Sequence, residues 1–259
     1  MKNPKILSIA LVISVLLNVV ILSVFAYKFY NNWFESTVLR TPFRSSLFNY
    51  SPKKEGLIYF VGDSHTEGFE LNEYLDNPLA RNRGIWGDLS TGVLKRIDSI
   101  AIRHPSKLFL MIGVNDIFTG ADPKDIAGNV EKIMIRITAL SPNTKVYIES
   151  VLPTDKPILH SNEPTYMAIK TLNNYYSILS TKYNAVFINL YPDFLQEKSL
   201  KQEYSYDGLH MNGKGYQKWA ELLKPYLTTG TQTLSINPVK TAGKVKTLSK
   251  TTPLIIKHE

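Results

Sequence analysis

The segment LIYFVGDSH, residues 57–65, contains the strongest indication of the fold. Its first five residues are apolar and mostly β-branched or aromatic, which is typical of a strand buried on both faces of a parallel sheet. Gly62 follows at once and permits a sharp turn. We therefore expect Ser64 at the carboxyl end of a buried strand.

A second segment, KLFLMIGVND at residues 107–116, repeats this pattern. Its apolar run ends at Gly113, and Asn115 follows in the next loop. In open α/β sheets, ligands bind in the crevice beyond the carboxyl ends of the strands. The sequence therefore predicts that the loops carrying Ser64 and Asn115 converge on one site.

The third segment is DGLH at residues 207–210, just before the amphipathic stretch 213–227. A serine hydroxyl is a weak nucleophile and needs a nearby base, a role that the imidazole of His210 can fill. Asp207 would orient that imidazole and stabilise its charged form. Since these residues are far from Ser64 in sequence, only folding can assemble the three into a catalytic triad.

An acyl-transfer site also needs hydrogen-bond donors for the negative charge that develops on the substrate oxygen. The side-chain amide of Asn115 suits this role. The backbone N–H groups of Ser64 and of a glycine such as Gly87 can complete an oxyanion hole, because a glycine lets the main chain approach closely.

These residues resemble the SGNH or GDSL hydrolases, in particular the branch similar to platelet-activating-factor acetylhydrolase and bacterial acylhydrolases. The resemblance spans residues 57–227 and rests on four blocks in the family's order: GDS at 62–64, NRGIWGD at 82–88, GVND at 113–116 and DGLH at 207–210. It implies that Ser64 is the nucleophile, His210 the base and Asp207 its partner.

The second block adds detail to the predicted site. The resemblance favours Gly87 over Gly84 as an oxyanion donor beside Asn115, because the family's functional glycine usually directly precedes the aspartate. Trp86 stands where related sequences often carry a small residue, and we expect it to contact the substrate and to cap the acyl pocket. The mechanism implied by the resemblance requires neither a metal ion nor an organic cofactor.

Other hydrolase classes fit less well. The nucleophile elbow of α/β-hydrolases, Gly-x-Ser-x-Gly, is missing because Thr66 replaces its second glycine. The five histidines show no HExxH or paired-ligand spacing typical of zinc hydrolases. His65 follows the nucleophile, and either a structural role or a contact with the pocket is open to it.

The rest of the body predicts one α/β domain. Further strands are expected at 145–150 and 185–190, with the least marked one near 80–83, and the helical stretches are 90–103, 125–140, 165–183 and 213–227. Strands that alternate with helices imply right-handed crossovers and a three-layer α/β/α sandwich. With the resemblance, this predicts a flavodoxin-like SGNH hydrolase fold with a parallel sheet of about five strands.

An uncharged apolar run at residues 6–27 precedes this domain. As a helix it would be about 33 Å long, enough to cross a bilayer. We favour an N-terminal transmembrane anchor (1–28), followed by a spacer (29–54), the hydrolase domain (55–229) and a basic flexible tail (230–259). The domain is then expected outside the cytoplasm, in the cell envelope; secretion after cleavage of a signal peptide is the alternative.

The formal net charge of +8 lies on the flanks of the chain. Before position 55 the chain has seven Lys or Arg and one acidic residue, whereas the domain has 18 basic and 20 acidic residues. Attraction of the flanks to anionic surfaces and simple solubility are both open, and nucleic-acid binding is disfavoured. The chain has no cysteine, so it forms no disulfides.

Three functions are compatible with these patterns. The first is a membrane-tethered serine esterase that removes small acyl groups, above all acetyl, from carbohydrate or related esters. The second uses the same triad on lipid or thioester acyl chains, as lysophospholipases and thioesterases do. The third is a non-catalytic binding module that retains the fold. The sequence leaves the oligomeric state and the choice between hydrolysis and acyl transfer open.

Overall fold

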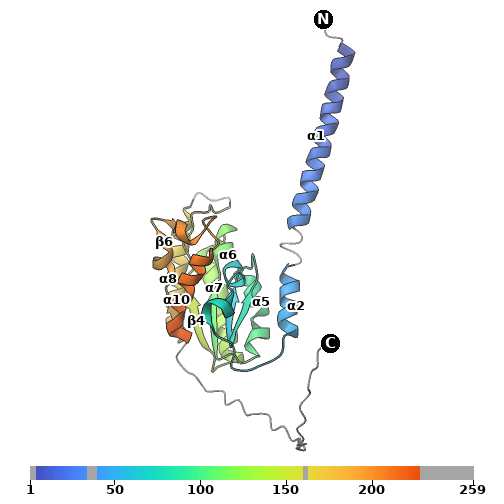
Figure 1. The fold of residues 1–259 in the computed structure, drawn as a ribbon. Coiled ribbons are helices and arrows are strands. Elements are labelled where there is room, and N and C mark those ends of the chain that lie inside the picture. The colour runs from blue at the N-terminus through green and yellow to red at the C-terminus, as the bar shows by residue number, and fades with distance from the viewer. Residues whose placement is uncertain (1–3, 34–39, 160–162, 228–259) are drawn as a thin grey trace, which may run out of the picture. The chain divides into compact units, whose positions relative to one another are not determined.

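A parallel sheet forms the centre of the domain in the computed structural model, which describes residues 4–33, 40–159 and 163–227 (Figure 1). Its strands, in spatial order, are β2 (Ala80–Gly84), β1 (Ile58–Gly62), β3 (Lys107–Met111), β4 (Lys145–Glu149) and β5 (Val186–Ile188). Every neighbouring pair is parallel. The predicted five-strand sheet is confirmed, including the strand expected near 80–83.

The strand order reverses direction at β1. The chain passes from β1 to β2 on one side and then crosses to β3 on the other side. Loops that leave β1 and β3 therefore diverge, and such a switch point is where open α/β sheets bind ligands. Ser64 and Asn115 follow these two strands, so the topology places both candidate residues at this crevice.

Three helices cover one face of the sheet, namely α5 (Ser90–Ala101), α7 (Pro123–Leu140) and α8 (Thr165–Lys182). Val93 and Ile97 of α5 and Val130 of α7 are fully buried against Tyr59 and Leu108 of the strands. The helices begin and end within a few residues of the predicted stretches. Asp122 accounts for the earlier start of α7, because its carboxylate accepts the Lys124 N–H at the helix N-terminus.

Aromatic side chains cover the opposite face. Phe60, Phe109 and Tyr147 occupy matching positions on β1, β3 and β4, and their rings stack with centroids 4.6 and 4.4 Å apart. Trp219 of α10 (Gly213–Leu227) is fully buried on this side and stacks on Phe69 at 4.6 Å. The sheet thus lies between two helical layers, which confirms the predicted sandwich (Figure 1).

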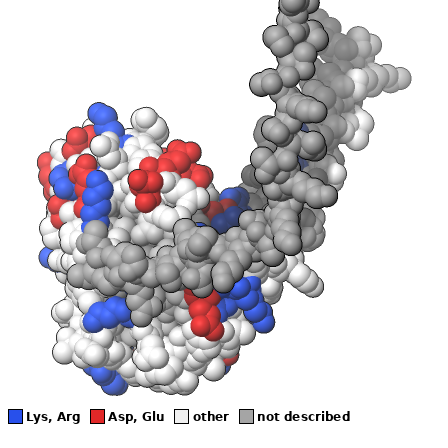
Figure 2. Space-filling view, turned by 60° about the horizontal axis from the view of Figure 1, so that its bottom comes forward, with Lys and Arg blue, Asp and Glu red and all other residues white. Residues whose placement is uncertain are grey.

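Shorter elements complete the domain. They are α3 (Ser64–Glu67), α4 (Leu71–Leu75), α6 (Val114–Phe118), α9 (Tyr191–Phe194), β6 (Leu195–Gln196), β7 (Ser199–Leu200) and η2 (Gln202–Tyr204). Figure 2 shows acidic and basic side chains interspersed on one face, as expected for a domain with nearly balanced charge.

Two helices precede the sheet. In α1 (Pro4–Trp33), the segment Leu11–Tyr30 is long and apolar enough to span a membrane, and a signal sequence would meet the same criteria. The interval predicted as a spacer contains α2 (Arg40–Tyr50). Pro42 is tolerated there because it lies in the first turn, where its missing N–H has no helical partner to lose. The predicted flexible tail, 230–259, lies outside the described residues.

Candidate active site

Ser64 lies at the turn from β1 into α3. Gly62 makes this turn possible, since a Cβ at that position would lie 2.2 Å from the Met111 carbonyl oxygen. The carboxylate of Asp63 then accepts the His65 N–H at 3.0 Å and caps the N-terminus of α3. Ser64 is the first residue of this helix and is 4% exposed. Its position is therefore fixed by the turn and the cap.

Asp207 holds His210. One carboxylate oxygen, Oδ2, lies 2.7 Å from His210 Nδ1, and the other accepts the backbone N–H groups of Leu209 and His210. Partial burial alone would raise the pKa of Asp207, but hydrogen bonds from His210 and from these N–H groups lower it well below its usual range. Asp207 thus stays ionised and orients the imidazole with Nδ1 protonated, leaving Nε2 as the free base.

His65 connects the turn that carries Ser64 to the loop that carries His210. Its Nδ1 lies 3.3 Å from Asp63 Oδ1 and its Nε2 lies 2.9 Å from the Leu209 carbonyl oxygen. Burial lowers the pKa of His65, but the hydrogen bond and charge of Asp63 raise it more, so that it lies above its ordinary value. The centroids of the His65 and His210 rings are 6.0 Å apart. This buried histidine therefore brings residues 207–210 beside Ser64.

Trp86 stacks on His210, with ring centroids 4.4 Å apart and planes inclined by 23°. The Arg40 guanidinium lies 5.3 Å from the centroid of the same indole. The backbone N–H of Trp86 donates to the carboxylate of Glu67, which also forms an ion pair with Arg40 at 2.8 Å. The indole is 40% exposed. The ring of Trp86 is thus held by His210 and Arg40 and its backbone by Glu67, while the residue is still accessible to a ligand.

The backbone turn after Trp86 presents Gly87 as a donor. The Asp88 N–H donates to the Ile85 carbonyl at 3.0 Å, and Gly87 has φ of +72°, as in a type II turn with glycine at its third position. Within the described residues, the N–H of Gly87 donates no hydrogen bond to the protein. The Gly84 N–H, in contrast, donates to Asn82 Oδ1 at 2.8 Å. This difference favours Gly87 as the oxyanion donor.

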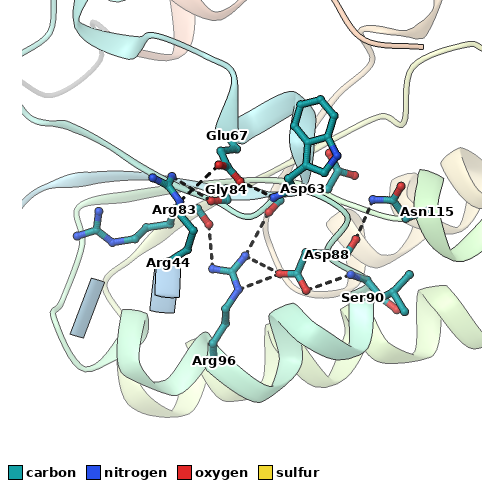
Figure 3. A network of polar contacts seen from close by, with 12 residues as sticks. Arg44, Asp63, Glu67, Arg83, Gly84, Asp88, Ser90, Arg96 and Asn115 are labelled. Atoms are coloured by element: carbon teal, nitrogen blue, oxygen red, sulfur yellow. Dashed lines mark hydrogen bonds and ion pairs between the residues drawn. The ribbon is translucent and has the colours of Figure 1, made fainter. Parts of the chain in front are cut away.

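The side-chain amide of Asn115 is held against the same turn. Its Nδ2 donates to the Asp88 carbonyl oxygen at 3.0 Å (Figure 3). One of the two amide protons is used in this way, and the other remains available to a ligand. The structure therefore brings Gly87 and Asn115, from loops after β2 and β3, to one place.

Arg96 supports the turn from below (Figure 3). Its guanidinium pairs with the Asp88 carboxylate at 2.9 Å and donates to the carbonyl oxygens of Gly62 and Arg83 at the ends of β1 and β2. Burial raises the pKa of Asp88 and lowers that of Arg96, and each partner opposes the shift of the other. Arg96 thus joins the end of β1, which precedes Ser64, to the turn at residues 85–88.

A groove of about 720 Å³ lies beside these turns. Trp86, Gly87 and Asp88 border it at one end, and α2 and α5 provide its walls. The residues of these two helices that line it are Thr41, Ser45, Phe48, Asn49, Thr91, Gly92, Lys95, Arg96, Ser99 and Ile100. Ser64 and His210 do not line the groove, whereas Trp86, which stacks on His210, does.

The residues that hold the site were not identified from the sequence. Arg96 offered one signal, because it lies three positions after the buried Val93 and one before the buried Ile97 on an amphipathic helix. Glu67 and Arg40 offered none, since their partners are remote in sequence. Among the described residues, no group of three or more His, Cys, Asp or Glu is placed to hold a metal ion.

Comparison with known proteins extends these observations. The family model described as GDSL-like Lipase/Acylhydrolase matches residues 60–218, which contain all the candidate site residues. No curated protein matches the chain.

Solved structures share the fold. A Streptococcus pneumonia protein, provisionally described as a platelet activating factor, is 28% identical with a TM-score of 0.67 over 79% of this chain and 99% of its own. A GDSL-like lipase from Bacteroides thetaiotaomicron is 24% identical with a TM-score of 0.63, covering 74% and 97% of the two chains. An acetyl xylan esterase is 22% identical with a TM-score of 0.57, covering 66% and 98%.

Proposed function

Since this chain belongs to the GDSL-like lipase/acylhydrolase family, we propose that it is a membrane-tethered serine esterase that removes small acyl groups, above all acetyl, from carbohydrate or related esters. One observation carries the proposal: Asp207 holds His210 by a 2.7 Å contact, and His65 ties this loop to the turn that carries Ser64. This contact supports roles for Ser64 as the nucleophile, His210 as the base and Asp207 as its orienting carboxylate.

In the proposed reaction, Ser64 Oγ attacks the ester carbonyl carbon while His210 Nε2 takes the hydroxyl proton. The imidazolium then returns this proton to the leaving alcohol as the C–O bond breaks, which leaves an acyl-serine. Water then attacks the acyl-serine with His210 again as the base, and His210 returns the proton to Ser64 Oγ as the acyl C–O bond breaks and the acid departs. Asp207 retains its charge throughout and stabilises the imidazolium.

The developing oxyanion would be bound by the N–H groups of Ser64 and Gly87 and by the amide of Asn115. Since Asn115 donates to the Asp88 carbonyl and Arg96 pairs with the Asp88 carboxylate, these donors would be oriented before the substrate arrives. Preorganised donors of this kind stabilise the transition state without the cost of reorganisation.

Trp86 supports the preference for a short acyl group. Its indole stacks on His210 and lies against the Arg40 guanidinium, and Glu67 holds its backbone N–H, so the ring would restrict the space beside the base. The same fold is used by an acetyl xylan esterase, so deacetylation of a polysaccharide is compatible with this scaffold.

Hydrolysis of p-nitrophenyl acetate and p-nitrophenyl decanoate tests the acyl preference. We expect the wild type to prefer acetate, Trp86→Gly to shift the preference toward decanoate, and Trp86→Phe to retain the wild-type preference because a ring still covers the site. A wild type that prefers decanoate would refute the cap and favour the lipid-type acylhydrolase. The absence of hydrolysis of either ester by pure, folded protein would leave only the non-catalytic binding module.

The membrane tether rests on α1, in which large apolar side chains between Leu11 and Tyr30 are exposed to the surroundings. With this helix as an uncleaved anchor, we propose that the catalytic domain lies outside the cytoplasm in the cell envelope. The test is the intact mass of the protein recovered from carbonate-washed membranes. A mass that includes the first 28 residues supports the anchor, whereas a soluble protein that lacks them indicates a cleaved signal peptide.

A further inference from the structure

The exposed face of α2 is apolar and follows closely after α1. Phe43, Leu47 and Tyr50 are spaced by four and three positions, so they lie on one side of the helix. Their exposed fractions are 64%, 50% and 89%. The opposite side carries Phe48, which is buried against the domain. The helix therefore presents a continuous apolar stripe, Phe43, Leu47 and Tyr50, away from the domain.

Hydrogen bonds from the domain fix the direction of this stripe. Arg103 donates to the carbonyl oxygens of Phe48 and Asn49 at 2.9 and 3.0 Å, which satisfies the last turn of α2. Arg44 donates to the Gly84 carbonyl oxygen at 3.2 Å, and Arg40 pairs with Glu67. Because α2 is held at both ends, turning the stripe inward would break these contacts.

The chain itself limits where α2 can lie. Only residues 34–39 separate the end of α1 at Trp33 from the start of α2 at Arg40. Even a fully extended link of this length spans only about 25 Å. If α1 crosses a membrane, the stripe is confined to the neighbourhood of that membrane's surface.

The charges nearby suit a lipid surface. Lys53 and Lys54 follow α2 and are exposed, and residues 28–54, at the α2 end of α1, contain five Lys or Arg against Glu35 alone. Lysine near a membrane surface is attracted to anionic headgroups, and aromatic rings prefer the interface between headgroups and acyl chains. An apolar stripe flanked by lysines is typical of helices that lie in this interface.

We propose that α2 is an interfacial helix that inserts Phe43, Leu47 and Tyr50 into the surface of the bilayer that α1 anchors. The proposal rests on the membrane tether in the proposed function. Since the other side of α2 lines the groove beside Trp86 and binds Glu67, this docking would hold the groove at the lipid surface. The partner is the phospholipid headgroup region.

Site-specific labelling tests this placement directly, because the chain contains no cysteine. Leu47→Cys and Tyr50→Cys variants of the full chain, each labelled with an environment-sensitive fluorophore, are reconstituted into phosphatidylcholine–phosphatidylglycerol vesicles with and without brominated acyl chains. Ile178→Cys on α8 is the matched control, since Ile178 is 56% exposed and therefore similar to Leu47. Circular dichroism confirms that each labelled variant is folded.

Brominated lipid should quench the labels at Leu47 and Tyr50 at least about twofold more than the label at Ile178, because interfacial helices bury their apolar face about 5–10 Å deep. Phe43→Asp in the Tyr50→Cys background should weaken this quenching. Equal quenching at all three positions would overturn the proposal. A label at Leu47 whose emission reports an apolar environment, but which brominated lipid does not quench, would also overturn the proposal. It would indicate contact with a second copy of the chain.

Flotation of the vesicles separates this inference from the tether. Protein that floats with the vesicles but shows no selective quenching refutes the interfacial helix and leaves the anchor intact. Protein that does not float refutes the anchor, and the interfacial helix with it. Neither result bears on ester hydrolysis, which is measured independently with p-nitrophenyl acetate.

Discussion

Glu149 should oppose folding at neutral pH, and its replacement by glutamine should stabilise the protein. Its side chain ends β4, is 1% exposed and accepts the Trp219 Nε1–H at 2.6 Å. Burial raises the pKa of Glu149 from 4.5 to about 8. The folded protein therefore keeps this carboxyl group neutral at pH 7, whereas the unfolded chain ionises it.

The size of the effect follows from this difference in pKa. A group whose pKa is raised on folding costs no stability below its unfolded pKa of 4.5, and the cost then grows with pH until the folded group also ionises near pH 8. Each pH unit in this window adds about 1.4 kcal/mol to this cost in the free energy of folding, so the cost at pH 7 is about 3 kcal/mol. Glu149→Gln retains a carbonyl acceptor for Trp219 and should recover about 2–3 kcal/mol of this.

Urea unfolding of the full chain in detergent micelles, followed by tryptophan fluorescence at pH 4.5 to 8, measures the effect. The free energy of unfolding of Glu149→Gln should exceed that of the wild type increasingly from pH 4.5 upward. Glu131→Gln is the control: Lys182 pairs with this surface carboxylate and lowers its pKa, so no such gain is expected. A difference between Glu149→Gln and wild type that is the same at every pH would refute the reasoning.

Three further predictions concern the site. Asn115→Ala should lower kcat for p-nitrophenyl acetate by about 10²–10³ with little change in KM, as expected when one oxyanion donor is lost; an unchanged kcat would exclude Asn115 from the oxyanion hole. Asp207→Asn should lower kcat by about 10³–10⁴ because His210 loses its orientation, and restoration of activity by Asp207→Glu is the expected sign of a carboxylate role. His65→Gln should destabilise the fold most below pH 6.5, because a pKa raised on folding gives stability that is complete below the unfolded pKa and is lost as pH rises through the folded one; a loss of stability that grows with pH in urea unfolding would contradict this.

The sheet was predictable because its signals are local. Residues 57–61 and 108–112 are uninterrupted apolar runs, and each is followed by a glycine that starts a polar loop. Parallel strands place such loops at the same edge of the sheet, so the sequence alone assigns the candidate residues to one site. The less apolar β2 was expected from the resemblance to the family and from the number of strands, rather than from its own sequence.

The supporting contacts were not predictable, because they pair residues that are remote in sequence. His65 is hydrogen-bonded to the carbonyl oxygen of Leu209, 144 positions away. A backbone carbonyl is present at every residue, so no local sequence pattern could identify this partner. Trp86 was assigned to the pocket from its size, but its stacking on His210 depends on how two loops fold.

α2 illustrates a different limit. Its residues, RTPFRSSLFNY, contain a proline and several polar side chains between the apolar ones, and the segment was interpreted as a spacer. Short helices are marginal in isolation and depend on tertiary packing, which Phe48 and Arg103 provide here. The spacing of Phe43, Leu47 and Tyr50 was the available signal, and it points away from the domain.

Labelling with a fluorophosphonate probe tests most directly whether Ser64 is an activated nucleophile. The reagent modifies a serine hydroxyl only where a base and oxyanion donors activate it, which here requires His210, Gly87 and Asn115 to act at the same hydroxyl. We predict stoichiometric labelling of the wild type and of Ser177→Ala, a surface control on α8, and none of Ser64→Ala. Undiminished labelling of Ser64→Ala, or no labelling of folded wild type, would contradict the account.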